Sequence, residues 1–340
     1  MEVYTFHHQE KFTLESGATL PSIEVVFHSS VAPGAIAEAI AQGRRVVWIC
    51  HALTANSNPA EWWSDLVGVG KYFDTQKDIV ICANTIGSCY GSSGPANWHG
   101  APLDFPHITV RDIVSAHIAL RKYLGIENID LMVGSSVGGF QALEWAIMEP
   151  EMMTTLILIA CNERITPWAT AFNESQRMAI EADQTFEQQA SLSGGAKGLQ
   201  AARSMALISY RSYVGYNSTQ TEEDDNCIKA QRAATYQRYQ GMKLSDRYDA
   251  YSYYYMTLML DSHNVGRSRG GVTKALGSIK AKTLVVAIGS DILFPPSEMQ
   301  YMASKIPSAH YTEIQSMFGH DGFLIEWRAL KRVVDQYFEA

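Results

Sequence analysis

The sequence predicts an α/β fold in which helices cover both faces of a mostly parallel sheet. Short runs of β-branched and aliphatic residues alternate along the chain with stretches of helical periodicity. Most of these runs are apolar throughout, as is typical of parallel strands that are buried on both faces. The chain has 340 residues, 46% of them hydrophobic, so it is long enough to bury a large core.

Six apolar runs are predicted to be strands of this sheet. In chain order they are residues 46–50, 78–83, 130–133, 155–159, 283–288 and 310–314. Helical patterns lie between or after them, at residues 110–123, 140–148 and 324–338. Residues 11–29 instead alternate around Gly17, which predicts an antiparallel hairpin at one edge of the sheet.

The segment from about residue 162 to residue 278 interrupts this alternation. It contains several helical patterns, including a face over residues 199–209 and a tyrosine-rich stretch at 247–261, but no convincing strand. We therefore expect a helical lid at 163–278, inserted into an α/β core of residues 1–162 and 279–340. The polar, acidic run at 218–225 is expected to be an exposed loop of this lid.

Composition excludes several classes of function. The net charge is −8 and no dense run of Lys and Arg occurs, so nucleic acid is not an expected partner. The first residues lack the features of a signal peptide and no apolar stretch is long enough to span a bilayer, so we expect a soluble, cytoplasmic protein. The five cysteines are scattered without a C-x-x-C pair, so no metal site is predicted.

Residues 134–138, Gly-Ser-Ser-Val-Gly, match the G-x-S-x-G pattern. They follow a predicted strand and precede a predicted helix, which is the context of a nucleophile elbow, where a sharp turn exposes a serine hydroxyl. The alternative is an ordinary glycine-rich turn. Ser135 competes as the nucleophile, but the spacing of the pattern favours Ser136.

Two downstream residues are candidates for the partners of Ser136. A serine hydroxyl needs an adjacent base, and in this kind of elbow the chain order is serine, acid, histidine. Asp291 follows the predicted strand 283–288, and His320 precedes the last predicted helix. A turn-forming aspartate and a loop histidine are the alternative interpretations, but their positions at two expected strand ends favour a catalytic triad.

The developing negative charge of an acyl-transfer reaction also needs backbone N–H donors. We predict that Val137, directly after the nucleophile, supplies one donor. Leu53, in the loop after the strand 46–50, is predicted to supply the other. His51, at the start of the same loop, is interpreted as a structural histidine.

With the triad assigned, further segments resemble motifs of the homoserine O-acyltransferase family of the α/β-hydrolase fold. The similar segments are 51–54, 84–95, 105–112, 141–145, 173–180, 239–243 and 319–324. The resemblance implies ping-pong transfer of an acetyl group from acetyl-CoA to the hydroxyl of L-homoserine, through an acyl-Ser136 intermediate, in methionine biosynthesis. It also implies that acetyl-CoA is a co-substrate, that no cofactor is permanently bound, and that the lid forms a homodimer.

The resemblance implies a clamp for the amino-acid substrate as well. Arg177 would pair with the substrate carboxylate, as guanidinium groups do in a bidentate fork, and Asp321 with the substrate ammonium. A salt bridge within the lid is the alternative role of Arg177, and a helix cap that of Asp321. Two departures from the family pattern concern the pocket: Val137 replaces a methionine, and residues 96–99 replace a pair of serines.

The sequence leaves the donor and the acceptor open. Succinyl-CoA as donor, or serine as acceptor, would use the same scaffold. An esterase or thioesterase would use water, but it has no need of an amino-acid clamp or of a large lid that keeps water from the acyl-enzyme. A catalytically silent relative that acts as a binding module is disfavoured by the intact triad.

Overall fold

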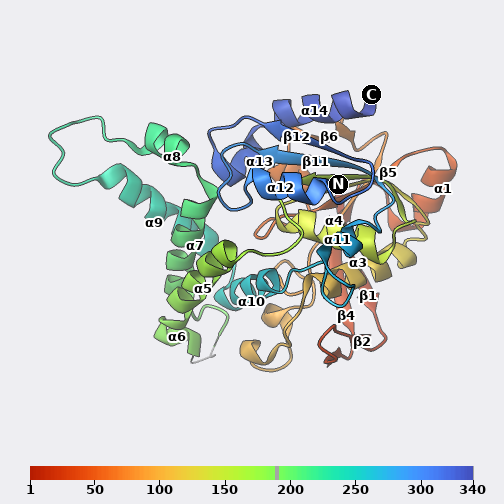
Figure 1. Ribbon diagram of the computed structural model, residues 1–340. Coiled ribbons are helices and arrows are strands. Elements are labelled where there is room, and N and C mark those ends of the chain that lie inside the picture. Colours follow the sequence, from red (N-terminus) through yellow and green to blue (C-terminus); the bar gives the residue numbers. More distant parts are fainter. Residues whose placement is uncertain (188–190, 340) are drawn as a thin grey trace.

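The computed structural model describes residues 1–187 and 191–339, and in these residues eight strands form one central sheet (Figure 1). Their order across the sheet is β1 (Glu2–His8), β4 (Ile23–Ser29), β8 (Ile79–Ala83), β5 (Val46–Cys50), β9 (Ile129–Ser135), β10 (Met153–Ile159), β11 (Lys282–Ile288) and β12 (Ala309–Ile314). The strands from β8 to β12 run parallel, and β1 and β4 form an antiparallel edge. The predicted α/β fold is confirmed.

The antiparallel edge differs from the hairpin that was predicted at 11–29. The turn at Gly17 joins β2 (Phe12–Thr13) to β3 (Thr19–Leu20), and this pair forms a small sheet of its own. The edge strand of the main sheet is β1, which pairs with β4 over seven residues, and β4 pairs in turn with β8. The prediction was wrong about the strand that pairs with β4. An alternating pattern indicates only strands that are joined by a turn, whereas β1 lies before the hairpin in the chain.

Side chains of each central strand alternate between two hydrophobic layers. On β5, Val46 and Trp48 face one layer, while Val47 and Ile49 face the other. The first layer includes buried residues of α1 (Ile36–Ala41), α3 (Val110–Tyr123), α4 (Val137–Met148), α11 (Val272–Leu276) and α12 (Pro296–Ala303). The second layer is covered by α14 (Trp327–Glu339), with α2 (Pro59–Trp62) and the short pair β6 (Val67–Gly68) and β7 (Phe73–Asp74) beside it.

Local signals explain where the helices begin and end. Thr109 starts α3 with a capping box, in which Asp112 Oδ2 accepts the Thr109 N–H at 2.8 Å. The helix predicted at 324–338 is instead divided into α13 (Gly322–Ile325) and α14. Glu326 separates them in a non-helical conformation, with φ −85° and ψ 39°.

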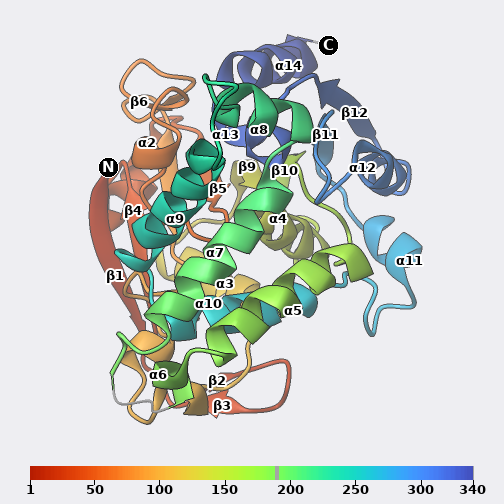
Figure 2. The same cartoon turned by 90° about the vertical axis from the view of Figure 1, so that its left-hand side faces the viewer.

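Between β10 and β11, the described residues form helices and no strands. They are α5 (Pro167–Glu181), α6 (Gln184–Glu187), α7 (Ala196–Tyr210), α8 (Tyr213–Gln220), α9 (Gln231–Ser245), α10 (Ala250–Asp261) and α11. Figure 2 shows α5, α7 and α9 side by side, and in Figure 1 α8 and α9 project away from the sheet as an arm. Residues 188–190 of the predicted lid lie outside the described residues, and the division into core and lid stays a prediction.

The last helix of this segment, α11, packs into the core through Ala275 and Leu276, so it belongs with the sheet rather than with the arm. No helix in the described ranges combines the length and the apolar content that a membrane span requires.

Candidate active site

Ser136 lies in the sharp turn between β9 and α4. Its φ of 54° and ψ of −126° are values that residues other than glycine rarely adopt, so the turn is strained. A Cβ atom at Gly138 would clash with the carbonyl oxygen of Cys50, and one at Gly134 with that of Gly138. The two glycines of the G-x-S-x-G pattern are therefore needed for the chain to turn and present the Ser136 hydroxyl.

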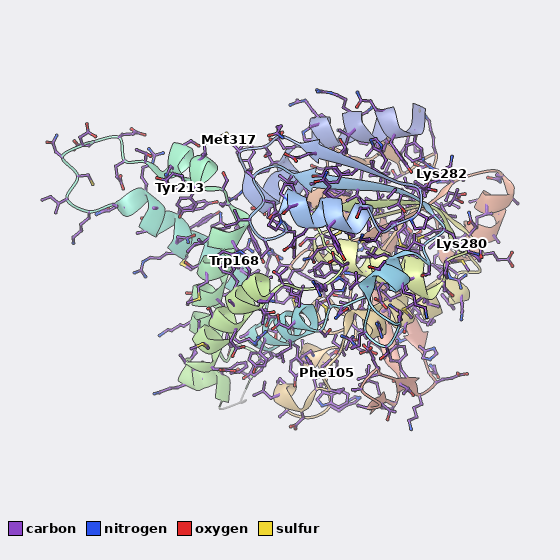
Figure 3. All side chains as sticks on the ribbon, in the orientation of Figure 1. Phe105, Trp168, Tyr213, Lys280, Lys282 and Met317 are labelled. Atoms are coloured by element: carbon purple, nitrogen blue, oxygen red, sulfur yellow. The ribbon has the colours of Figure 1, made fainter. Side chains whose placement is uncertain are left out.

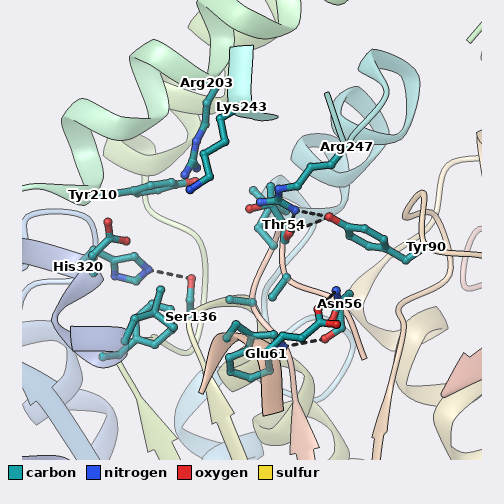
Figure 4. Close-up of a pocket in the computed structure, with 17 residues that line it drawn as sticks. Thr54, Asn56, Glu61, Tyr90, Ser136, Arg203, Tyr210, Lys243, Arg247 and His320 are labelled. Carbon is teal, nitrogen blue, oxygen red and sulfur yellow. Dashed lines mark hydrogen bonds between the residues drawn. The ribbon is translucent and has the colours of Figure 1, made fainter. Parts of the chain in front are cut away.

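The structure brings the three predicted triad residues together. The Nε2 atom of His320 lies 2.9 Å from Ser136 Oγ (Figure 4). Its Nδ1 atom lies 2.7 Å from Asp291 Oδ2. The other oxygen of Asp291 accepts the N–H groups of Leu293 and Phe294 at 2.8 and 3.1 Å. The carboxylate is thus fixed from both sides and holds the imidazole toward the serine.

The surroundings of His320 favour its role as a base. Burial disfavours the charged imidazolium, but the charge and the hydrogen bond of Asp291, together with the charge of Asp321, outweigh burial and raise the pKa of His320. Asp291 accepts the Nδ1 proton, so the Nε2 lone pair faces Ser136 Oγ. In this tautomer, His320 is ready to accept the hydroxyl proton of Ser136.

The two predicted oxyanion donors lie beside the nucleophile. Leu53 and Val137 both line a small cavity of about 20 Å³ that Ser136 borders. Val137 is the first residue of α4, so its N–H has no acceptor within the helix and points from the positive end of the helix dipole. This arrangement is compatible with a role of both N–H groups as oxyanion donors, and that role stays a prediction.

A larger cavity of about 690 Å³ opens above Ser136 and His320 (Figure 4). Three cationic side chains of the helical segment line it: Arg203, Lys243 and Arg247. Sequence reasoning missed Arg203, which lies about two helical turns before Tyr210 on α7. Its guanidinium lies 5.4 Å from the centre of the ring of that tyrosine. Its place at the site depends on where α7 packs, so the sequence of the helix alone carried no signal for it.

The two residues that were predicted to clamp the substrate lie in different places. Asp321 lines the large cavity, where Arg211 Nη1 lies 2.9 Å from its Oδ2. Burial raises the pKa of Asp321, although Arg211 opposes this effect. Arg177 does not line either cavity; its Nη2 lies 2.6 Å from Asp261 Oδ2, and it also pairs with Glu174. The two residues are therefore not brought together.

In the part of the chain that the structure describes, no metal-binding cluster is present and the segment 96–98 does not reach the cavities. Within residues 1–187 and 191–339, no group of three or more His, Cys, Asp and Glu side chains is arranged to hold a metal ion. The segment 96–98, which departs from the family pattern, does not line either cavity. Trp98 packs edge-on against Phe105, with ring centroids 5.5 Å apart.

Comparison with known proteins shows what the chain resembles. A family model described as the alpha/beta hydrolase fold matches residues 45–326. The chain is 41% identical to a homoserine O-acetyltransferase of Cyclobacterium marinum, over 98% of this chain and 94% of the relative. It is 38% identical to a homoserine O-acetyltransferase of Nostoc punctiforme, over 96% of this chain and 94% of that relative.

Solved structures share the fold. The homoserine O-acetyltransferase of Bacillus anthracis has a TM-score of 0.87 at 20% identity, over 100% of this chain and 98% of that chain. The acetyl esterase MekB has a TM-score of 0.84 at 24% identity, over 100% of this chain and 96% of that chain. The same fold thus occurs in proteins named for acyl transfer and in proteins named for ester hydrolysis.

Proposed function

Because the chain belongs to the homoserine O-acetyltransferase family of the α/β-hydrolase fold, we propose that it moves an acetyl group from acetyl-CoA to the hydroxyl of L-homoserine. The observation that carries this proposal is the Ser136–His320–Asp291 hydrogen-bonded chain at the floor of a cavity lined by both cationic and acidic side chains. A neutral ester does not need such charges, whereas an amino acid does. The product would serve methionine biosynthesis.

The first half of the reaction acylates the enzyme. Ser136 Oγ attacks the thioester carbonyl carbon while His320 Nε2 accepts the hydroxyl proton. The N–H groups of Leu53 and Val137 stabilise the negative charge on the carbonyl oxygen. The C–S bond then breaks, His320 returns the proton to the thiolate, and CoA leaves as the free thiol.

The second half transfers the acetyl group to the acceptor. His320 accepts the proton of the homoserine hydroxyl, whose oxygen attacks the carbonyl carbon of acetyl-Ser136. When the tetrahedral intermediate collapses, the ester bond to Ser136 breaks and His320 returns the proton to its oxygen. The product is O-acetylhomoserine, and the enzyme regains its starting state.

The small cavity supports acetyl rather than succinyl as the transferred group. Apart from Ser136, it is lined by Leu53, Val137, Ile165, Ala169, Phe172, Asn173, Gln176, Ser209, Tyr210, Leu260, Leu293 and Phe294. None of these described residues carries a positive charge, so a succinyl carboxylate would be buried without a counter-ion. A methyl group fits the same space without such a cost.

The large cavity supports a revised clamp for homoserine. We propose that Arg203 pairs with the substrate carboxylate and Asp321 with the ammonium group, because both line the cavity above Ser136. An approaching ammonium would favour the charged form of Asp321, whose pKa is raised by burial in the free enzyme. Arg177 would instead stabilise the lid through its ion pairs with Glu174 and Asp261.

The projecting arm supports a homodimer. Exposed apolar side chains gather on the arm and the end of α7, and Figure 3 shows Tyr213 there. They are Ile208, Tyr213, Val214, Tyr239 and Met242, each more than half exposed. We propose that two copies bury these side chains against each other. Sedimentation should show a dimer that Val214→Asp dissociates; a monomeric wild type would contradict this.

Intact-protein mass spectrometry tests the proposed reaction. The enzyme is mixed with acetyl-CoA or succinyl-CoA, and homoserine, serine or buffer is then added. An acetyl adduct that homoserine discharges rapidly and buffer slowly is expected. A succinyl adduct would change the donor, discharge by serine would change the acceptor, and rapid discharge by buffer would identify an esterase.

A further inference from the structure

The peptide between Ala52 and Leu53 carries the N–H that we assign to the oxyanion hole. Its carbonyl oxygen accepts hydrogen bonds from His51 Nδ1 at 2.8 Å and from the Ala55 N–H at 3.1 Å. In a trans peptide the C=O and N–H groups point in opposite directions, so these bonds also fix where the Leu53 N–H points. His51 Nε2 accepts the Thr85 N–H at 3.2 Å, which places the imidazole proton on Nδ1.

The lid holds a second carbonyl of the same loop, that of Thr54. Arg247, between α9 and α10, donates from Nη1 to the Thr54 oxygen at 2.6 Å and to the hydroxyl of Tyr90. The Tyr90 hydroxyl in turn donates to the Thr54 oxygen at 3.3 Å. Figure 4 shows these three residues together, across the cavity from Ser136. Residues 51–55 are therefore tied both to the sheet and to the lid.

We propose that Arg247 is a positioning residue that holds the oxyanion loop in its active geometry and so couples the reactivity of Ser136 to the seating of the lid. Leu53 and Thr54 are the two central residues of the turn closed by Ala55, so a shift of the Thr54 carbonyl also rotates Leu53. The donor is a charged guanidinium, which binds a carbonyl more strongly than a neutral group does. The inference rests on the proposed function, which makes the Leu53 N–H a donor.

The glycine-rich segment at 84–95 gains a purpose in this arrangement. Its Tyr90 supports Arg247, and its Thr85 orients His51. Asn84 Oδ1 also accepts the N–H of Ser57 at 2.7 Å, just after the loop. The segment therefore braces the oxyanion loop.

A competing role for Arg247 is to bind a phosphate group of CoA, because the residue lines the large cavity. The two roles predict different kinetics. A phosphate ligand affects only donors that carry phosphate, and mainly their KM. A positioning residue changes the acylation rate constant of every ester or thioester, since each one develops the same oxyanion.

The test measures acylation by acetyl-CoA and by p-nitrophenyl acetate, which has no phosphate. Arg247→Ala should lower the acylation rate constant about 10- to 100-fold with both donors, the range expected when a catalytic donor is misplaced. Arg247→Lys should recover part of this loss. Tyr90→Phe, which removes only one hydroxyl, should give a smaller decrease of the same kind. Arg238→Ala, an exposed site on α9 with the same change of charge, is the matched control.

Two results would overturn the inference. Arg247→Ala that raises only the KM for acetyl-CoA and leaves p-nitrophenyl acetate unaffected would make Arg247 a phosphate ligand. Unchanged kinetics with both donors, in an enzyme that still transfers acetyl groups to homoserine, would remove the inference alone and leave the proposed function standing. If Arg247→Ala does not fold, Tyr90→Phe decides the question. A wild type that neither donor acylates would overturn both proposals.

Discussion

Replacing Asp291 by asparagine isolates the electrostatic part of the triad. The Asp291 carboxylate accepts the Nδ1 proton of His320 through Oδ2 and two backbone N–H groups through Oδ1. An asparagine oxygen can keep the backbone bonds, but its amide would then turn an N–H toward Nδ1. His320 would be forced into the tautomer with its proton on Nε2, facing Ser136 Oγ, where it cannot act as a base.

The expected loss follows from this wrong tautomer. Asp291→Asn should lower the acylation rate constant about 10⁴-fold, by analogy with a triad of the same geometry, which is about 5.4 kcal/mol of transition-state stabilisation. Stopped-flow release of p-nitrophenol from p-nitrophenyl acetate measures the rate, and thermal unfolding checks that the variant is folded. A folded variant that retains more than about a tenth of the wild-type rate would refute the assigned role of Asp291.

The pH profile gives an independent measure of the same interaction. Because only neutral His320 accepts the Ser136 proton, and Asp291 raises its pKa, wild-type acylation should rise with pH through a midpoint above the ordinary value of 6.5. In Asp291→Asn only the charge of Asp321 still opposes burial, so the midpoint of the residual activity should shift to lower pH. A midpoint that does not move between the two proteins would contradict this account.

The remaining predictions concern the elbow and the lid. Gly138→Ala should yield no active, folded enzyme, because the added methyl group clashes with the Cys50 carbonyl, whereas Gly34→Ala meets open space and should unfold at the wild-type temperature; an active Gly138→Ala would contradict the geometry of the turn. Arg177→Ala should lower the unfolding free energy by about 1–3 kcal/mol, because Asp261 loses its partner, while the KM for homoserine should stay near the wild-type value. Denaturant unfolding and acceptor titration check both parts, and a large rise in that KM would restore Arg177 to the clamp.

The parallel part of the fold was predictable because its strands are apolar throughout and short. The run predicted at 46–50 coincides with β5, and that at 155–159 lies within β10. The strand β1 was not predicted, since its partner β4 is 15 residues farther along the chain and only the intervening turn at Gly17 was visible. Pairing between separated segments depends on the whole sheet, which local periodicity does not report.

The candidate site was likewise predictable from the sequence only in part. Ser136, Asp291 and His320 each follow a strand of the parallel sheet. Their order along the chain and their positions after these strands were therefore enough to predict that they form one site. Arg203 comes from α7, whose position over the site is set by packing between lid helices rather than by any pattern in its own sequence. The basic face of the cavity could therefore be found only in three dimensions.

The position of the helical segment between β10 and β11 has a consequence for biosynthesis. Ser136 precedes this segment and Asp291 and His320 follow it, so that the base lies 184 positions after the nucleophile. During translation the serine therefore emerges long before the groups that activate it. On the proposed mechanism its hydroxyl remains an ordinary alcohol until β11 and β12 have joined the sheet, so we expect that an incomplete nascent chain does not form an acyl-enzyme.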